Sequence, residues 1–102
     1  MAIKKRVKEK FSRYDTADYL KSEADMVAYL EACMAEADDD PAFIAVALGN
    51  IARAYGMVRL AKDTGLTREG LYKALSADGN PSLGTVLKVV KALGMKLTPE
   101  VA

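Results

Sequence analysis

The sequence predicts an all-α protein built as a small bundle of short helices. Apolar residues recur every three or four positions over most of the chain, which places them on one face of a helix. Alternation of apolar and polar residues, the pattern of a half-buried strand, is almost absent. Capping residues before the apolar runs and glycines after them divide the chain into separate helices.

Two regions precede the main bundle. Residues 1–14 are expected to form a basic tail, and residues 15–39 a helical extension. Asp15 or Thr16 is expected to cap a short helical turn, and Ser22 to begin a longer helix. Apolar residues at three- and four-residue spacing predict the buried face of this helix: Met26, Leu30, Cys33, Met34 and Ala37.

The next helix begins at Asp40-Pro41. Asp40 offers an acceptor at the N-cap, and Pro41 fits the first helical position because the amide there has no partner. Gly56 is expected to end this helix in a left-handed conformation. Its predicted core positions are Phe43, Ile44, Ala47, Leu48, Ile51 and Tyr55.

Three shorter helices follow in the prediction. The first covers residues 57–64 and stops at Gly65, the second covers residues 67–77 with Thr67 as its cap, and the third runs from about residue 80 or 82 to Gly94. Residues 95–98 alternate apolar and polar side chains, which permits a short strand paired with a partner chain, and residues 99–102 are a tail. The inward positions are expected to be Leu60, Ala61, Leu71, Ala74 and Leu75, then Leu83, Val86, Leu87, Val90 and Leu93 on the last helix, with Lys88 and Lys91 outside.

The composition disfavours several classes of function. A chain of 102 residues with 51% hydrophobic and 28% charged residues has the composition of one folded domain. It has no histidine and only Cys33, which excludes histidine-dependent triads, an intrachain disulfide and a multi-cysteine zinc site. We therefore expect no enzyme, no cofactor and no metal. No apolar run approaches about 18 residues, so we expect no membrane span and a cytoplasmic location.

The charges divide along the chain although the net charge is only +1. Residues 1–10 carry five basic side chains and one acid, residues 11–40 carry two basic side chains and nine acids, and residues 41–102 carry eight basic side chains and four acids. This division suggests two surfaces with different partners. Residues 3–10 are either an arm that reaches DNA or a solvated terminus.

The two short helices around Gly65 are the candidate functional element. In a helix-turn-helix the helices cross steeply, so a small residue such as Ala61 fits their closest approach, and Gly65 supplies the positive φ of the turn. The outward positions then fall on the N-terminal half of the second helix, which such a motif presents to base edges in the major groove. A helical bundle that binds no nucleic acid is the alternative.

Each outward side chain suits a contact with duplex DNA. Arg68 can donate two hydrogen bonds to guanine, Glu69 can accept one from cytosine, and Tyr72 can pack on a thymine methyl group or reach a phosphate. Arg59, Lys73 and Asn80 suit phosphates beside the groove. The candidate DNA-binding residues are Arg59, Thr67, Arg68, Glu69, Tyr72, Lys73 and Asn80.

Residues 41–94 resemble the five-helix Xre/Cro-type, lambda-repressor-like DNA-binding domain. The stretches AYLEACMAEADDDPAFIAVALGNIARAYGM and LAKDTGLTREGLYKALSADGNPSLGTVLKVVKALGMKL are more specific, because they resemble the addiction-module antidote proteins, which are HigA-like antitoxins of prophages and plasmids. The resemblance covers about residues 14–98 and implies that residues 40–98 are the helix-turn-helix domain.

The resemblance also implies partners. These are double-stranded operator DNA, which a homodimer would bind to repress its own operon, and a RelE/ParE-like toxin, which the protein would neutralise by direct binding. The last helix and residues 95–98 are the expected dimer contacts. The acidic helix ahead of the DNA-binding domain is a reasonable surface for a basic toxin. A stand-alone prophage-type repressor without a toxin is the alternative.

Overall fold

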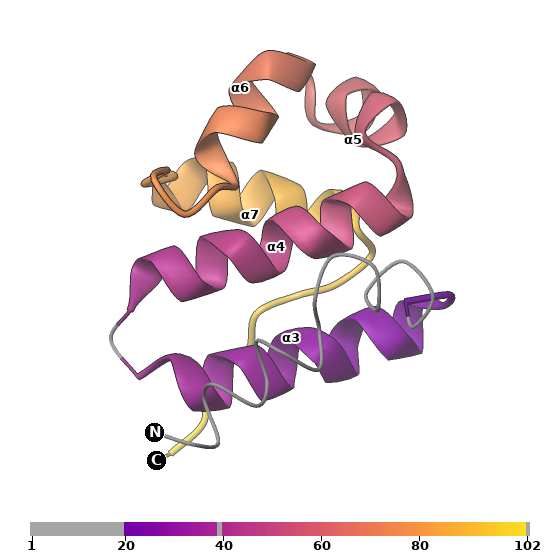
Figure 1. The fold of residues 1–102 in the computed structure, drawn as a ribbon. Coiled ribbons are helices and arrows are strands. Elements are labelled where there is room, and N and C mark those ends of the chain that lie inside the picture. Colours follow the sequence, from indigo (N-terminus) through magenta and orange to yellow (C-terminus); the bar gives the residue numbers. More distant parts are fainter. Residues whose placement is uncertain (1–19, 39, 102) are drawn as a thin grey trace.

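Five helices make up the described part of the chain, residues 20–38 and 40–101 of a computed structural model (Figure 1). Within these residues there is no strand, so the described part is all-α as predicted. The predicted basic tail and the short turn before Leu20 lie outside the described residues. The helices are α3 (Glu23–Ala37), α4 (Pro41–Tyr55), α5 (Met57–Thr64), α6 (Arg68–Ala74) and α7 (Leu83–Ala92).

Local capping chemistry sets where α3 and α4 begin. The Ser22 hydroxyl accepts a hydrogen bond from the Asp25 amide, and the Asp40 carboxylate accepts one from the Ala42 amide at 3.0 Å. Pro41 occupies the first turn of α4. These contacts satisfy amides that the helix itself leaves without partners, and they confirm both predicted starts.

Helices α3 and α4 lie side by side and antiparallel, joined by a short turn (Figure 1). The side-chain amide of Asn50 donates a hydrogen bond of 2.9 Å to the Tyr29 hydroxyl and ties the two helices together. Every helix contributes to one hydrophobic core, in which burial of apolar surface is the main stabilising term. The largest fully buried side chains include Leu48, Ile51, Leu60, Leu71, Leu75, Val89 and Leu93.

The buried stripe of α3 differs from the predicted one at both edges. Met34 is 47% exposed, whereas Tyr29 is buried. Successive residues of a helix are rotated by about 100° around its axis. On this basis the apolar residues of α3 form an arc centred on Met26, with Tyr29 at one edge and Met34 at the other. Helix α4 packs against the Tyr29 edge, so the prediction for Met34 is wrong.

Helix α7 shows the same kind of difference. Leu83 is 70% and Leu87 48% exposed, although both were expected in the core. Val89 is fully buried in their place, beside Val90. The side of α7 that packs on the core consists of Val86, Val89, Val90 and Leu93. Leu87 is rotated by about 100° around the helix axis from Val86 and therefore lies outside this side.

The structure differs from the prediction at three further places, all at or after the C-terminal end of a helix. Helix α6 ends at Ala74 rather than residue 77. Gly56 has the predicted positive φ of 117°, but its ψ of 114° lies outside the left-handed helical region. Residues 95–98 form no strand and run instead beside α3 (Figure 1).

Within the described residues, no single helix is both long and apolar enough to cross a membrane. Helices α4 and α5 reach that length only together, and the chain bends by 105° between them.

Candidate functional site

A tight turn joins α5 to α6. Gly65 adopts a left-handed conformation, φ 76° and ψ 9°, and its amide donates to the Ala61 carbonyl at 2.9 Å. The Thr64 hydroxyl donates to the Leu60 carbonyl and accepts from the Leu66 amide. A side chain at residue 65 would meet no atom within 4 Å, so the turn requires glycine for its backbone conformation rather than for space.

The first turn of α6 is held by its cap. The Thr67 hydroxyl accepts a hydrogen bond of 2.9 Å from the Gly70 amide, which confirms the predicted cap. A Cβ at Gly70 would lie 2.9 Å from the same hydroxyl oxygen, so the absence of a side chain there keeps the cap uncrowded. The Thr67 hydroxyl oxygen therefore caps α6, and the hydroxyl proton can still donate a hydrogen bond to another group.

The inner face of α6 fixes which side chains point outward. Leu71 and Leu75 are almost completely buried, and these two anchors leave the N-terminal part of the outer face in solvent. Tyr72 is 40% exposed. The structure places all seven candidate residues at the surface: Arg59, Thr67, Arg68, Glu69, Tyr72, Lys73 and Asn80.

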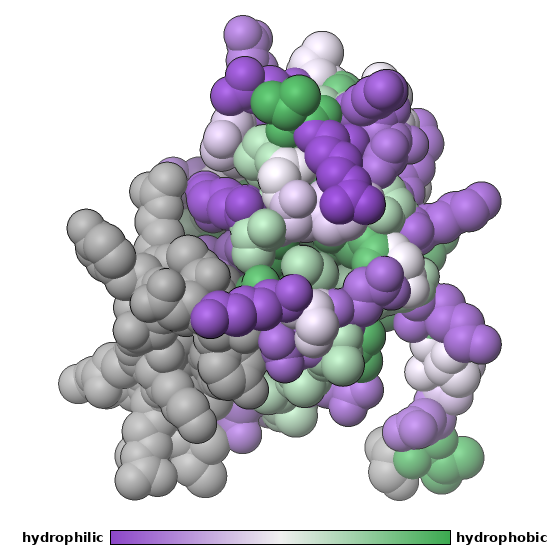
Figure 2. All heavy atoms as spheres, turned by 90° about the vertical axis from the view of Figure 1, so that its right-hand side faces the viewer, coloured by the Kyte–Doolittle hydropathy of each residue, from purple (hydrophilic) through white to green (hydrophobic). Residues whose placement is uncertain are grey.

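Helices α5 and α6 form one end of the molecule, and α3 lies at the other (Figure 1). Hydrophilic side chains gather over the end that α5 and α6 form (Figure 2). Helices α5 and α6 carry four cations and two acids: Arg59, Lys62, Arg68 and Lys73, with Asp63 and Glu69. Helix α3 carries four acids and no cation. Helix α3 therefore has a net negative charge, whereas α5 and α6 together have a net positive charge.

Arg53 is a residue of this end that the sequence reasoning missed. It lies in the last turn of α4, half-buried, and its guanidinium carbon is 5.7 Å from the centre of the Tyr72 ring. Its buried Nε has no hydrogen-bond partner within residues 20–38 and 40–101. The available signal was a single cation in an otherwise apolar helix. Such a guanidinium orients the Tyr72 ring through a cation–π contact.

Gly49 is a second residue that the sequence reasoning missed. A Cβ at this position would lie 2.3 Å from the Leu75 carbonyl oxygen, so α4 and the end of α6 approach each other closely here. A glycine inside a helix lowers helix stability, and this cost was the signal that it has a packing role.

Arg59 is held against α4 by a second aromatic contact. Its guanidinium carbon lies 4.2 Å from the centre of the Tyr55 ring. The Tyr55 hydroxyl donates a hydrogen bond of 2.8 Å to the Asp63 carboxylate, which raises the pKa of Tyr55 above its ordinary value because the bond requires the protonated phenol. The three side chains join the end of α4 to α5.

No cluster of three metal-ligating side chains occurs in the described residues. Cys33 lies in the core, where burial raises the pKa of its thiol, partly offset by a hydrogen bond from Tyr29. A buried thiol with a raised pKa is a poor nucleophile and serves as a core residue here.

Comparisons with known proteins add a family assignment. Residues 10–101 match the model of a family described as "Probable addiction module antidote protein". A protein of Haemophilus influenzae, described as an uncharacterized protein, is 47% identical over 88 residues, which are 86% of this chain and 89% of that protein. No solved structure matches significantly.

Proposed function

We propose a function from one established premise: the chain belongs to the family of probable addiction module antidote proteins. It acts as a sequence-specific DNA-binding antitoxin of a type II toxin–antitoxin module. It neutralises a RelE/ParE-like toxin by direct binding and represses its own operon in the cytoplasm. The proposal requires no catalysis, no cofactor and no metal.

One observation carries the DNA-binding part. The left-handed Gly65 turn and the buried Leu71 and Leu75 turn the outer face of α6 into solvent, with Arg68, Glu69, Tyr72 and Lys73 upon it. An Xre/Cro-type helix-turn-helix has this arrangement, in which the second helix enters the major groove. Residues 41–94, which resemble that five-helix domain, hold four helices, α4 to α7, and α3 packs on α4 from the preceding segment.

A homodimer fits the exposed apolar face of α7. Leu83 and Leu87 are 70% and 48% exposed, and burying such side chains against a second copy is favourable. Two-fold symmetry would place two copies of α6 in successive major grooves, about 34 Å apart. The operator is then expected to be a palindrome.

Two measurements test the proposal. The first is fluorescence anisotropy of the purified chain on the duplex upstream of its own reading frame, against a scrambled duplex of equal length. We expect preference for the upstream duplex and a steep loss of affinity with salt, since phosphate contacts release counterions. Equal binding to both duplexes, or binding to neither, would contradict the DNA-binding part.

The second measurement is co-expression with the product of the neighbouring reading frame. We expect a stable complex and rescue of growth from that product. Binding to the upstream duplex without binding to the neighbouring product would instead indicate a stand-alone repressor, the alternative function.

A further inference from the structure

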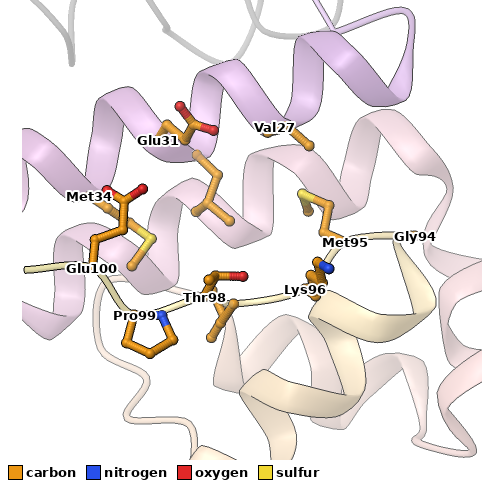
Figure 3. Close-up of a pocket in the computed structure, with 11 residues that line it drawn as sticks. Val27, Glu31, Met34, Gly94, Met95, Lys96, Thr98, Pro99 and Glu100 are labelled. Carbon is orange, nitrogen blue, oxygen red and sulfur yellow. The ribbon is translucent and has the colours of Figure 1, made fainter.

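A groove runs between α3 and the segment that follows α7. Its volume is about 910 Å³. Val27 and Met34 on α3 face Met95 and Thr98 on the C-terminal segment across it (Figure 3). The two elements that line the groove, α3 and the segment after α7, lie at the opposite end of the molecule from α6 (Figure 1). A molecule bound in the groove would therefore leave the outer face of α6 open.

The groove exposes apolar side chains that the fold does not cover. Val27 is 36%, Met34 47% and Leu97 41% exposed, and all three line it. Met95 and Met34 add two flexible, polarizable side chains, which adapt their shape to a partner. A run of exposed apolar residues with polar neighbours is typical of an interaction site.

The charged side chains that the structure describes around the groove are mainly negative. Glu31 and Glu100 line the groove. A third carboxylate, that of Glu23, lies beside the lining residue Gly94: a Cβ added to Gly94 would be 2.9 Å from a Glu23 carboxylate oxygen. Lys96 is the one cation among the lining residues. An occupant that fits both properties is apolar and carries Lys or Arg beside its apolar residues.

We propose that this groove holds an apolar, positively charged segment of the toxin, so that one protomer binds toxin through α3 and DNA through α6. The inference rests on the proposed function and names the partner surface within it. The carboxylates of Glu31 and Glu100 attract the basic toxin segment to the groove. The exposed apolar side chains of Val27, Met34 and Leu97 then pack against it.

The experiment compares two matched substitutions. Val27→Lys places a cation in the groove, and Val46→Lys places the same cation at an equally exposed valine of α4, 38% against 36%, that does not line the groove. The probe is the purified product of the neighbouring reading frame, and its affinity is measured by calorimetry. We expect Val27→Lys to weaken binding by at least about ten-fold and Val46→Lys to change it less than two-fold, with the upstream duplex bound equally by both.

A second pair tests the charge. Glu31→Gln removes a groove carboxylate, and Glu36→Gln removes one from α3 outside the groove. We expect Glu31→Gln to slow association about two- to five-fold at low salt and to flatten its salt dependence, with a smaller effect for Glu36→Gln. Equal effects from the two substitutions would contradict a charge contribution from this groove.

The other possible results would each reject the toxin as the occupant of the groove. Unchanged binding of the probe to the Val27→Lys variant would overturn the groove while leaving the proposed function intact. Loss of dimer mass in sedimentation with unchanged probe affinity would assign the groove to a second copy of the chain. A lower free energy of unfolding for Val27→Lys than for Val46→Lys, again with unchanged probe affinity, would assign it to another segment of the same chain. Failure of the unmodified chain to bind the probe would overturn the antitoxin function itself.

Discussion

The guanidinium carbon of Arg53, in the last turn of α4, lies 5.7 Å from the centre of the Tyr72 ring on the outer face of α6. The contact links the core helix to the proposed recognition helix. Arg53 is half-buried, its Nε has no hydrogen-bond partner among the described residues, and the Tyr72 ring lies within cation–π distance of its guanidinium.

We predict that Arg53→Met lowers affinity for the upstream duplex by about 0.5–1 kcal/mol, the range of a solvent-exposed cation–π contact, because Tyr72 loses the guanidinium that orients its ring. Anisotropy titrations measure this. In a Tyr72→Leu background the same substitution is expected to have no further effect, since the contact is already absent. Additive losses in the double variant would show that Arg53 acts independently of Tyr72.

Arg68→Ala and Lys73→Ala are expected to differ in kind. Loss of a base contact at Arg68 should cost about 1–3 kcal/mol on the upstream duplex and relax base preference at one position. Loss of a phosphate contact at Lys73 should weaken all duplexes evenly and reduce the salt slope by about 1. Titrations on single-base variants of the duplex, at several salt concentrations, separate the two. Unchanged affinity of Arg68→Ala would mean that α6 is oriented differently in the complex.

Gly65→Ala should destabilise the fold by about 1–2 kcal/mol, because alanine is strained at the positive φ of 76° in the α5–α6 turn. Gly84→Ala is the matched control. Gly84 lies in α7, has an ordinary φ and has its nearest crowding atom, the Ser82 hydroxyl, at 3.8 Å. Alanine there should stabilise by up to about 1 kcal/mol. Urea unfolding measures the change in free energy of unfolding for both substitutions. A change in the same direction for both would contradict the left-handed turn assigned to Gly65.

Gly49→Ala should also destabilise the protein, but for a steric reason. Its Cβ would stand 2.3 Å from the Leu75 carbonyl oxygen, which is backbone and has to move. We expect a loss of about 1–3 kcal/mol from overpacking, although alanine is the better helix former. The Leu75 end of α6 would shift with it, so duplex affinity should fall together with the unfolding free energy. A variant as stable as the unmodified chain would show that α4 and α6 separate easily.

We predict that the hydrogen bond between Tyr55 and Asp63 makes the free energy of unfolding fall at alkaline pH. Its hydrogen bond to Asp63 raises its pKa in the folded state above the ordinary value near 10.0. The stabilising contribution is therefore complete below the pKa of the unfolded chain and declines as the pH rises through the folded pKa. Urea midpoints measured from pH 8 to pH 11 should fall less in Tyr55→Phe than in the unmodified chain. An identical decline in both would assign the alkaline loss to other groups.

Much of the proposed site was predictable because it depends on local chemistry. Gly65, Thr67 and Leu71 follow from turn, cap and periodicity, and those three positions alone place Arg68 and Tyr72 on the outer face of α6. Arg53 and Gly49 were not predictable in the same way. Arg53 lies against Tyr72, 19 positions further along the chain, and Gly49 lies against Leu75, 26 positions further, so neither role could be predicted from a local sequence pattern.

By itself, the sequence determined that the described chain is helical, where α3, α4 and α6 begin, and where α5 ends. Ser22, Asp40, Thr67 and Gly65 act on amides and carbonyls within four residues of themselves, so their effect needs no partner element. Only the tertiary structure decided which edge of each apolar arc is buried: Tyr29 rather than Met34, and Val89 rather than Leu87. The apolar arc of each helix is wider than the face that its neighbour covers, and the packing of the other helices selects the part that leaves solvent.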